Sequence, residues 1–395
     1  MQPRSPRTLL LAAVAAAVIA IALLAIPIYV IRPFVPQSPR ALALALEVRT
    51  LAPELSLFCA AIALYAFYRC WSPSRWPTRL LLILAVIFTL PTIALTRVNI
   101  FERMFHPNLA PSFQPIAEAA LAPHDMLLVV TLDGQSRGYP VRSLGYHHII
   151  NDNLANQPIA ITYCTLCHTG LVWSRNLNGQ TLTFRLAGIN NGNALLRDEQ
   201  TNSIWQQSTG ESIFGKLKGQ HLQLVHSDEL SATVLSTEHP TATILRPDPA
   251  TASLYDPPDW EQHVARTHVV VDVSSSKIDP HEIMYAVTIG NATRAYPLRT
   301  ILAEGLIQDA LADNPVLLVV APDGISVRAF DPGSLTFTRD TAGNLHDLST
   351  GSSWSANGCA IEGPQANHCL SAREAHKTFW FDWLNHHPDT TVYNK

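Results

Sequence analysis

The sequence predicts an α+β protein in which an N-terminal three-helix membrane region is followed by an internally duplicated, strand-rich domain of mixed α/β elements. Three observations lead to this prediction: long apolar runs near the N-terminus, short β-type segments after them, and a repeat at a constant offset of 157 residues. At 395 residues, the chain is also long for a single compact domain.

The formal net charge of −4 is distributed unevenly along the chain. Residues 1–105 hold ten Arg and three acidic residues, a net charge of +7, whereas the remaining 290 residues carry a net charge of −11 and all sixteen His. An acidic globular part excludes a nucleic-acid partner whose binding depends on a basic surface. The apolar content of 47% argues against disorder. We therefore expect two parts in different environments, one of them a lipid bilayer.

The membrane region is expected to cover residues 1–105, with transmembrane helices at about 8–31, 53–71 and 80–96. The first run contains no charged residue, and about 20 apolar residues span a bilayer as a helix. It is also longer than the roughly 7–15 apolar residues of a cleaved signal peptide, and Arg32 follows it without a small-residue cleavage site. These features predict a retained signal anchor.

Arginines flank the three predicted spans in equal numbers on both sides. The short loop after the second span is the densest of these segments, because it holds Arg69, Arg75 and Arg79. Short, positively charged loops stay in the cytoplasm most consistently. We therefore expect the amino terminus in the cytoplasm and the large acidic domain outside it.

The repeat aligns two segments of the large domain without a gap. Residues 123–132 match residues 280–289, and Arg137-Gly-Tyr-Pro-Val-Arg142 matches Arg294-Ala-Tyr-Pro-Leu-Arg299 at the same offset. Trp205 matches Trp354 farther on, after loop-length changes have shifted the offset, and we interpret Trp205 first as a core residue. The match predicts two copies of one supersecondary unit.

The first copy is expected at 106–246 and the second, degenerate copy at 267–395, with a Pro-rich linker at 247–266. Branched and apolar runs predict strands, and polar-apolar patterns predict one short helix in each copy. The predicted strands of the first copy are 126–131, 158–163, 171–174 and 182–186, and the predicted helices are 141–154 and 298–311.

The two copies differ at a Cys-x-x-Cys motif. Cys164 and Cys167 lie in the first copy, and Ala321 and Gly324 occupy the aligned places in the second. Because both sulfurs are absent from the second copy, any chemistry is expected in the first, with the second as structural support.

Four interpretations of Cys164-Thr-Leu-Cys167-His168 remain open. Two thiolates at this spacing can chelate a soft metal such as copper or zinc. They can form a reducible disulfide. With His168 directly after them, they match a c-type haem attachment motif. They can also form an inert structural disulfide in a non-catalytic binding or scaffold module.

His147 is the third candidate residue, because Glu304 replaces it in the second copy. On the predicted helix His147 and Asn151 are i, i+4 neighbours that could reach the two thiols. We therefore expect Cys164, Cys167 and His147 as the reactive set. Metal ligation would add His168 to these three, and His168 is also the weak candidate for cofactor binding.

The other cysteines are expected to be structural. Cys359 and Cys369 would close a short loop in the second copy as a disulfide. Cys59 and Cys70 fall within the second predicted span, where thiols usually act as apolar packing groups.

Several of these motifs together resemble the domain of unknown function 3179 (DUF3179) family. They are Thr162-Tyr-Cys-Thr-Leu-Cys167, His147 with Asn151-Asp152, the Trp-Gln segment at 201–210, and the closing segment at 379–390. The resemblance covers roughly residues 107–393 and leaves out the three spans.

The resemblance implies a bacterial or archaeal membrane-attached protein, here of the bacterial inner membrane with a periplasmic C-terminal domain. It implies no agreed activity. The family pattern usually reads Thr-Tyr-Cys-Pro-Leu-Cys-Gly, and this sequence has Thr165 and His168 at the Pro and Gly positions. Since that departure creates the haem-like motif, the resemblance favours haem c less than metal or redox chemistry.

Overall fold

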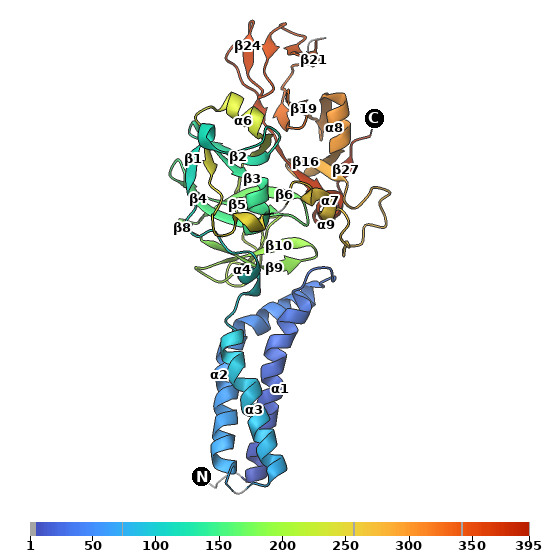
Figure 1. Cartoon of the computed structure of the whole chain (residues 1–395). Helices are drawn as coiled ribbons and strands as arrows, with labels where there is room; N and C mark the ends of the chain where they lie inside the picture. Colours follow the sequence, from blue (N-terminus) through green and yellow to red (C-terminus); the bar gives the residue numbers. More distant parts are fainter. Residues whose placement is uncertain (1–4, 73, 256, 341–342, 395) are drawn as a thin grey trace. The chain divides into compact units, whose positions relative to one another are not determined.

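The computed structural model describes residues 5–72, 74–255, 257–340 and 343–394 (Figure 1). The chain divides into two compact units. The helical unit comprises residues 1–104 with 187–191, and the strand-rich unit comprises residues 105–186 with 192–395. The architecture is α+β, with helices first and several sheets after them.

The helical unit contains α1 (Pro6–Val30), α2 (Pro39–Cys70) and α3 (Trp76–Leu95), each long and apolar enough to cross a membrane. α1 and α2 both start on a Ser-Pro pair, in which the Ser hydroxyl accepts a backbone N–H and Pro fits the first helical position. The buried faces are rich in Ala, which lets the helices approach closely. A short helix, α4 (Ile100–Met104), follows.

α2 is longer than the apolar run 53–71 predicts. Glu47 and Arg49 interrupt the apolar pattern before Pro53, and the prediction therefore began after them. The helix instead begins at the Ser38 cap, whose side chain accepts from Ala41 N, and it continues through Pro53.

The first half of the strand-rich unit contains three principal sheets. Their strand orders are β1-β15-β3-β2-β14, β13-β6-β5-β4 and β12-β11-β10-β9. The strands are β1 (Phe113–Pro115), β2 (Met126–Leu132), β3 (Gln135–Pro140), β4 (Ile149–Leu154), β5 (Gln157–Cys164), β6 (Thr169–Ser174), β9 (Phe184–Asn190), β10 (Asn193–Asp198), β11 (Ile204–Gln206), β12 (Ser212–Phe214), β13 (Leu224–Val225), β14 (Asp228–Ser231) and β15 (Thr243–Leu245). A two-stranded ribbon of β7 (Asn176–Leu177) and β8 (Gln180–Thr181), and the helices α5 (Val141–His147) and α6 (Ala232–Glu238), complete this half.

The second half contains three further sheets, with strand orders β26-β16-β17-β27, β18-β19-β20-β25 and β21-β22-β23-β24. Their strands are β16 (Ile283–Ile289), β17 (Ala292–Pro297), β18 (Leu306–Leu311), β19 (Asn314–Val320), β20 (Val327–Asp331), β21 (Phe337–Arg339), β22 (Leu345–Asp347), β23 (Ser353–Trp354), β24 (Ala360–Glu362), β25 (Ser371–Ala372), β26 (Glu374–Phe379) and β27 (Thr391–Val392). The helix α7 (Trp260–Val264) precedes this half, and α8 (Leu298–Glu304) and α9 (Trp380–His386) belong to it.

Both predicted helices of the large domain were too long. α5 ends at His147 because His148 adopts a left-handed conformation with φ of 60°, and the branched residues after it form β4. α8 ends in the same way at Gly305, with φ of 72°, before β18. The prediction that His147 and Asn151 share a helix face is therefore wrong. Asn151 lies in β4 and exchanges two hydrogen bonds of 2.9 Å with the backbone of Phe184.

Strand β26 of the second half is attached to the Cys-x-x-Cys loop of the first. Phe379 N donates to the Cys167 carbonyl at 2.8 Å. The buried hydroxyls of Thr169 and Thr378 hydrogen-bond at 2.8 Å. Because α9 follows β26 directly, these bonds fix its residues beside the cysteines.

Cys359 and Cys369 form the predicted disulfide, which closes a loop with a sequence separation of 10. A crosslink of this loop length stabilises a protein by about 2–3 kcal/mol, because it restricts the unfolded chain. We expect the double variant Cys359→Ala/Cys369→Ala to lose this amount of unfolding free energy. Urea unfolding of the full-length protein, followed by Trp fluorescence, measures the loss. An unchanged midpoint would contradict the stabilising role.

Candidate functional site

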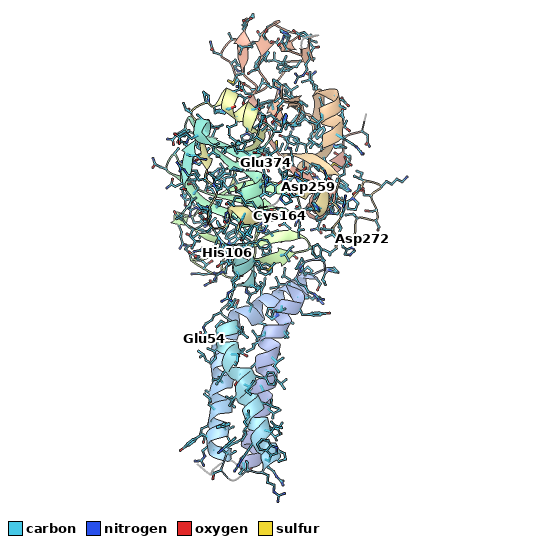
Figure 2. All side chains as sticks on the ribbon, in the orientation of Figure 1. Glu54, His106, Cys164, Asp259, Asp272 and Glu374 are labelled. Atoms are coloured by element: carbon cyan, nitrogen blue, oxygen red, sulfur yellow. A yellow bond between two sulfur atoms is a disulfide. The ribbon has the colours of Figure 1, made fainter. Side chains whose placement is uncertain are left out.

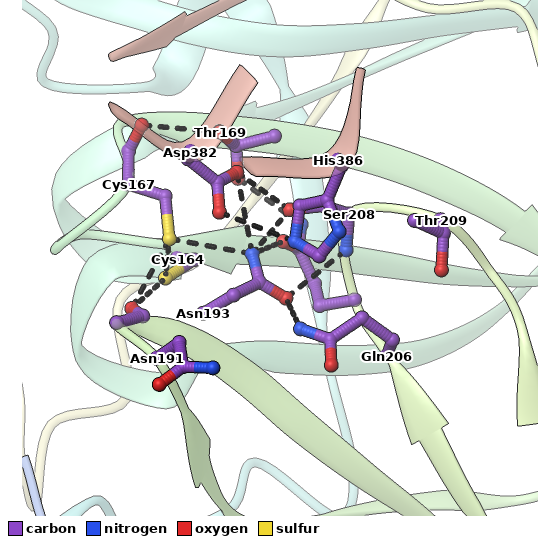
Figure 3. A network of polar contacts seen from close by, with 12 residues as sticks. Cys164, Cys167, Thr169, Asn191, Asn193, Gln206, Ser208, Thr209, Asp382 and His386 are labelled. Atoms are coloured by element: carbon purple, nitrogen blue, oxygen red, sulfur yellow. Dashed lines mark hydrogen bonds and ion pairs between the residues drawn. The ribbon is translucent and has the colours of Figure 1, made fainter. Parts of the chain in front are cut away.

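Cys164 and Cys167 lie where β5 turns into β6, inside the strand-rich unit (Figures 2 and 3). Cys164 is the last residue of β5 and pairs with Thr169 across the hairpin. His168 adopts φ of 55°, which lets the chain return within a tight loop. The two sulfur atoms lie 2.8 Å apart, with exposed fractions of 3% for Cys164 and 0% for Cys167. The fold therefore places both thiols together in a buried position.

A second hairpin, between β9 and β10, supplies polar atoms to the sulfurs. The Gly192 carbonyl lies 3.1 Å from Cys167 Sγ and 3.5 Å from Cys164 Sγ, so that it accepts from the thiols. Gly192 has φ of 92°, and an added Cβ would lie 3.1 Å from the Phe381 ring. Asn193 Nδ2 donates to Cys167 Sγ at 3.3 Å. A glycine is needed at 192 for both the turn and the close approach.

Neighbouring amides hold the Asn193 side chain in one orientation (Figure 3). Its Oδ1 accepts from Gln206 Nε2 and from Ser208 N, and its Nδ2 donates to Gln207 Oε1 at 3.2 Å. Gln207 Nε2 in turn donates to Thr162 Oγ1 at 3.1 Å. Because Asn193 and Gln207 are fully buried, this network fixes a polar shell beside Cys167.

Asp382 and His386 of α9 complete the site. Ser208 Oγ donates to Asp382 Oδ2 at 2.6 Å, and Asn193 Nδ2 lies 3.5 Å from the same oxygen. His386 Nε2 lies 3.6 Å from Asp382 Oδ1, one helical turn along α9. The sequence prediction missed both residues, although both lie in the closing segment 379–390 that carried the family resemblance.

The surroundings of the site shift the pKa of the Cys167 thiol and that of the Asp382 carboxyl in opposite directions. Burial raises the pKa of Cys167 well above 9.0, and the neighbouring Cys164 and the Asp382 carboxylate add to the increase. Burial also opposes ionisation of Asp382, but its bonds with His386 and Ser208 hold its pKa below the usual value. Burial lowers the pKa of His386, and the Asp382 carboxylate more than reverses this effect. At neutral pH the site therefore holds a protonated Cys167 thiol beside an ionised carboxylate.

The hydrogen bonds of His147 lead away from the sulfurs. Its Nδ1 lies 2.6 Å from the His106 carbonyl, and its Nε2 lies 3.0 Å from the Tyr255 hydroxyl. Burial is the main cause that lowers the pKa of this ring. His147 is thus placed as a buried group that ties α5 to residues 106 and 255.

His168 also forms its contacts elsewhere. Its Nε2 lies 2.7 Å from Glu261 Oε1 of α7, and its ring stacks on Trp260 at a centroid distance of 5.3 Å. Phe379 packs against the same ring at 5.2 Å. The imidazole is 1% exposed within this aromatic cluster.

The two sulfurs have a separation that suits bond formation better than chelation. A tetrahedral ion bound at about 2.3 Å to each sulfur would hold them roughly 3.8 Å apart. Among the residues that the structure describes, His, Cys, Asp and Glu side chains form no group of three or more placed to hold a metal ion. The separation of 2.8 Å is therefore shorter than a shared metal ion would impose.

Comparison with known proteins is consistent with the motifs. No curated protein and no solved structure matches the chain. A family model described as protein of unknown function (DUF3179) matches residues 106–390, which include both cysteines, Asn193, Asp382 and His386. The chain therefore belongs to the DUF3179 family.

Proposed function

We propose that Cys164 and Cys167 form a thiol–disulfide redox centre in a membrane-anchored, extracytoplasmic protein. The observation that carries this proposal is the 2.8 Å separation of the two sulfurs inside a hydrogen-bonded shell. A disulfide requires a sulfur separation of about 2.05 Å, so oxidation needs only a small movement of the side chains.

The proposed reaction consists of two thiol–disulfide exchanges. Cys164, the more exposed thiol, loses its proton and attacks one sulfur of a disulfide substrate, which releases the first substrate thiol. A mixed disulfide then joins Cys164 to the other half of the substrate. Cys167 loses its proton and attacks Cys164 Sγ, which closes the protein disulfide and releases the second thiol. The protein dithiol loses two electrons and the substrate disulfide gains them.

The competing chemistries find less support in the surroundings of the sulfurs. Soft-metal binding by copper or zinc would use Cys164 and Cys167, with His147 and His168 as further ligands. Those two rings are bonded to His106, Tyr255 and Glu261 instead. Covalent haem attachment at Cys164-Cys167-His168 would use His168 as an iron ligand, and this ring is instead bonded to Glu261 and stacked on Trp260.

The proposed location rests on two features. The disulfide between Cys359 and Cys369 is typical of oxidising compartments outside the cytoplasm. The basic loop between α2 and α3 favours the cytoplasmic side, which puts the C-terminal end of α3 on the other side of the membrane. Both features support a periplasmic location of the strand-rich unit.

We also propose that the strand-rich unit arose by duplication, with copies at 106–246 and 267–395 and a linker at 247–266. Each half contains a β-hairpin, a short helix and an antiparallel strand pair in the same order. In the first, Asp152 Oδ2 binds Arg137 at 2.6 Å and the Tyr139 hydroxyl at 2.5 Å. In the second, Asp309 binds Arg294 and Tyr296 in the same pattern, at the offset of 157 residues.

The test uses the full-length protein in detergent with Cys59→Ala and Cys70→Ala, so that Cys164 and Cys167 are the remaining reducible pair besides the structural disulfide. The protein is reduced and mixed with a peptide disulfide. The amount of reduced peptide formed per mole of protein is then measured. We expect one peptide disulfide reduced per protein in a single turnover, without any bound metal in an elemental analysis of the purified protein. Stoichiometric copper or zinc, or thiols that leave the peptide disulfide intact, would contradict the proposal.

A further inference from the structure

The buried thiol of Cys167 needs a proton acceptor before it can attack Cys164. At neutral pH this thiol is protonated, and its exposed fraction of 0% separates it from water. The ionised carboxylate of Asp382 belongs to α9 of the second half, which has no Cys-x-x-Cys pair of its own. The two halves of the strand-rich unit therefore meet at this site.

We propose that Asp382 accepts the Cys167 proton and that the His386 imidazolium, once its carboxylate partner is neutralised, releases one of its own protons to solvent. This inference rests on the proposed redox function, and it gives the second half a direct part in the chemistry. Asp382 Oδ2 is held on the side of Cys167 by Ser208 and Asn193, and Asn193 also contacts Cys167 Sγ.

The exposed fraction of the side chains increases along this route. Cys167 is fully buried, the Asp382 side chain is 3% exposed and the His386 side chain is 14% exposed. His386 Nε2 forms an ion pair with Asp382 Oδ1 at 3.6 Å and has no hydrogen-bond partner among the described residues. When the carboxylate takes the proton of Cys167, the imidazolium loses the charge that stabilises it and can release a proton toward solvent.

Other titratable groups surround this pair. Cys164 and Cys167 face it from the β5–β6 loop, His376 lies on β26, and His387 follows α9. Burial is the largest cause of the low pKa, about 4, of both His376 and His387. Neither ring is charged at neutral pH, so His386 is the cationic partner of Asp382 there.

The proton balance of the second exchange is complete. The S–H bond of Cys167 breaks and its proton moves to Asp382. The Cys167 sulfur then bonds to Cys164 Sγ, and the substrate sulfur leaves as a thiolate. With Asp382 neutralised, the His386 imidazolium releases one proton to water, from which the released thiolate is protonated. Asp382 then loses its proton to water and His386 regains one from water, which restores the ion pair.

The experiment follows the two exchanges separately with an aromatic disulfide that releases one coloured thiolate at each step. The full-length protein with Cys59→Ala and Cys70→Ala is the parent, and Asp389→Asn, an exposed carboxylate beyond α9, is the matched control. We expect Asp382→Asn to slow the second release by at least about tenfold and to leave the first release unchanged. The variant His386→Gln should slow the second release as well. If Asp382→Asn fails to fold, His386→Gln replaces it as the test of the inference.

The direction in which Asp382→Asn changes the rate of the second release distinguishes proton acceptance from a purely electrostatic role of Asp382. The Asp382 charge disfavours the Cys167 thiolate, so removal of this charge alone would speed the second release. A second release that is unchanged or faster in folded Asp382→Asn would overturn the inference and leave the redox function intact. Absence of a second release from the parent would instead overturn the redox function.

Discussion

Cys164→Ser is expected to abolish disulfide exchange, whereas Cys167→Ser is expected to stop it halfway. The asymmetry follows from the proposed order of attack, in which Cys164, 3% exposed against 0% for Cys167, meets the substrate first. A Cys167→Ser protein should accumulate a stable mixed disulfide on Cys164. Mass spectrometry of the full-length protein after incubation with a peptide disulfide measures the trapped adduct, and its rate of formation should fall to background in Cys164→Ser.

The control for these substitutions is the pair Cys59 and Cys70 of the helical unit. Replacement of both by Ala should leave exchange unchanged, because they lie in α2 and are not part of the Cys-x-x-Cys motif. An adduct on Cys167 in the Cys164→Ser protein would reverse the proposed order of attack. If both single variants lost stability and Cys167→Ser formed no adduct, the cysteines would be a structural crosslink.

The second large effect concerns the ion pairs between the two halves of the strand-rich unit. Arg328 of β20 has a side chain that is 6% exposed, and it binds Asp228 of β14 at 3.1 Å and Glu238 of α6 at 2.5 Å. Removal of one member leaves uncompensated buried charge, which costs about 3–5 kcal/mol. We expect Arg328→Ala to lose this amount of unfolding free energy in urea.

Arg299→Ala is the matched control, because its side chain is 76% exposed and its bond to Glu282 is open to solvent. Exposed pairs of this kind contribute between about 0 and 1 kcal/mol. A loss for Arg328→Ala that is no larger than the loss for Arg299→Ala would show that the buried pairs do not hold the halves together.

The same pairs predict an acid dependence of stability. Burial acts to raise the pKa of Asp228, but His226 and Arg328 together hold it below 3.8. A depressed carboxylate pKa stabilises the fold above the unfolded value of about 4, and this contribution disappears as the pH falls through the folded value. The urea midpoint should therefore fall with acid below about pH 4 more steeply in the parent than in Arg328→Ala. Equal slopes would contradict this contribution.

The residue pattern was sufficient to predict the strands that are specified by their own local sequence. The predicted strands at 126–131 and 158–163 correspond to β2 and β5, because alternating and branched residues suit buried strands. The helix at 141–154 was misassigned because His148, which ends α5 with a positive φ, is not a residue that usually signals a helix end.

The site could be predicted only in part, for a physical reason. The Cys164–Cys167 loop is a local feature of one hairpin, so the spacing of the motif was enough to find it. Asp382, with His386 one helical turn farther on, is placed at this site by the hydrogen bonds of β26 to the loop, a contact between residues more than two hundred positions apart. His147 was expected at the sulfurs because Glu304 replaces it in the second copy and because the predicted helix extended to Asn151, whereas α5 ends at His147.

The most direct test of the redox centre is its reduction potential. The Cys59→Ala/Cys70→Ala protein is equilibrated in redox buffers that range from oxidised glutathione to excess dithiothreitol. The samples are then quenched with acid and alkylated, and mass spectrometry of the peptide that contains Cys164 and Cys167 measures its dithiol and disulfide fractions. The account predicts a reversible two-electron transition between dithiol and disulfide within this range, with the Cys359–Cys369 disulfide retained until stronger reduction. A pair that stays dithiol, or stays disulfide, across the whole range would contradict it.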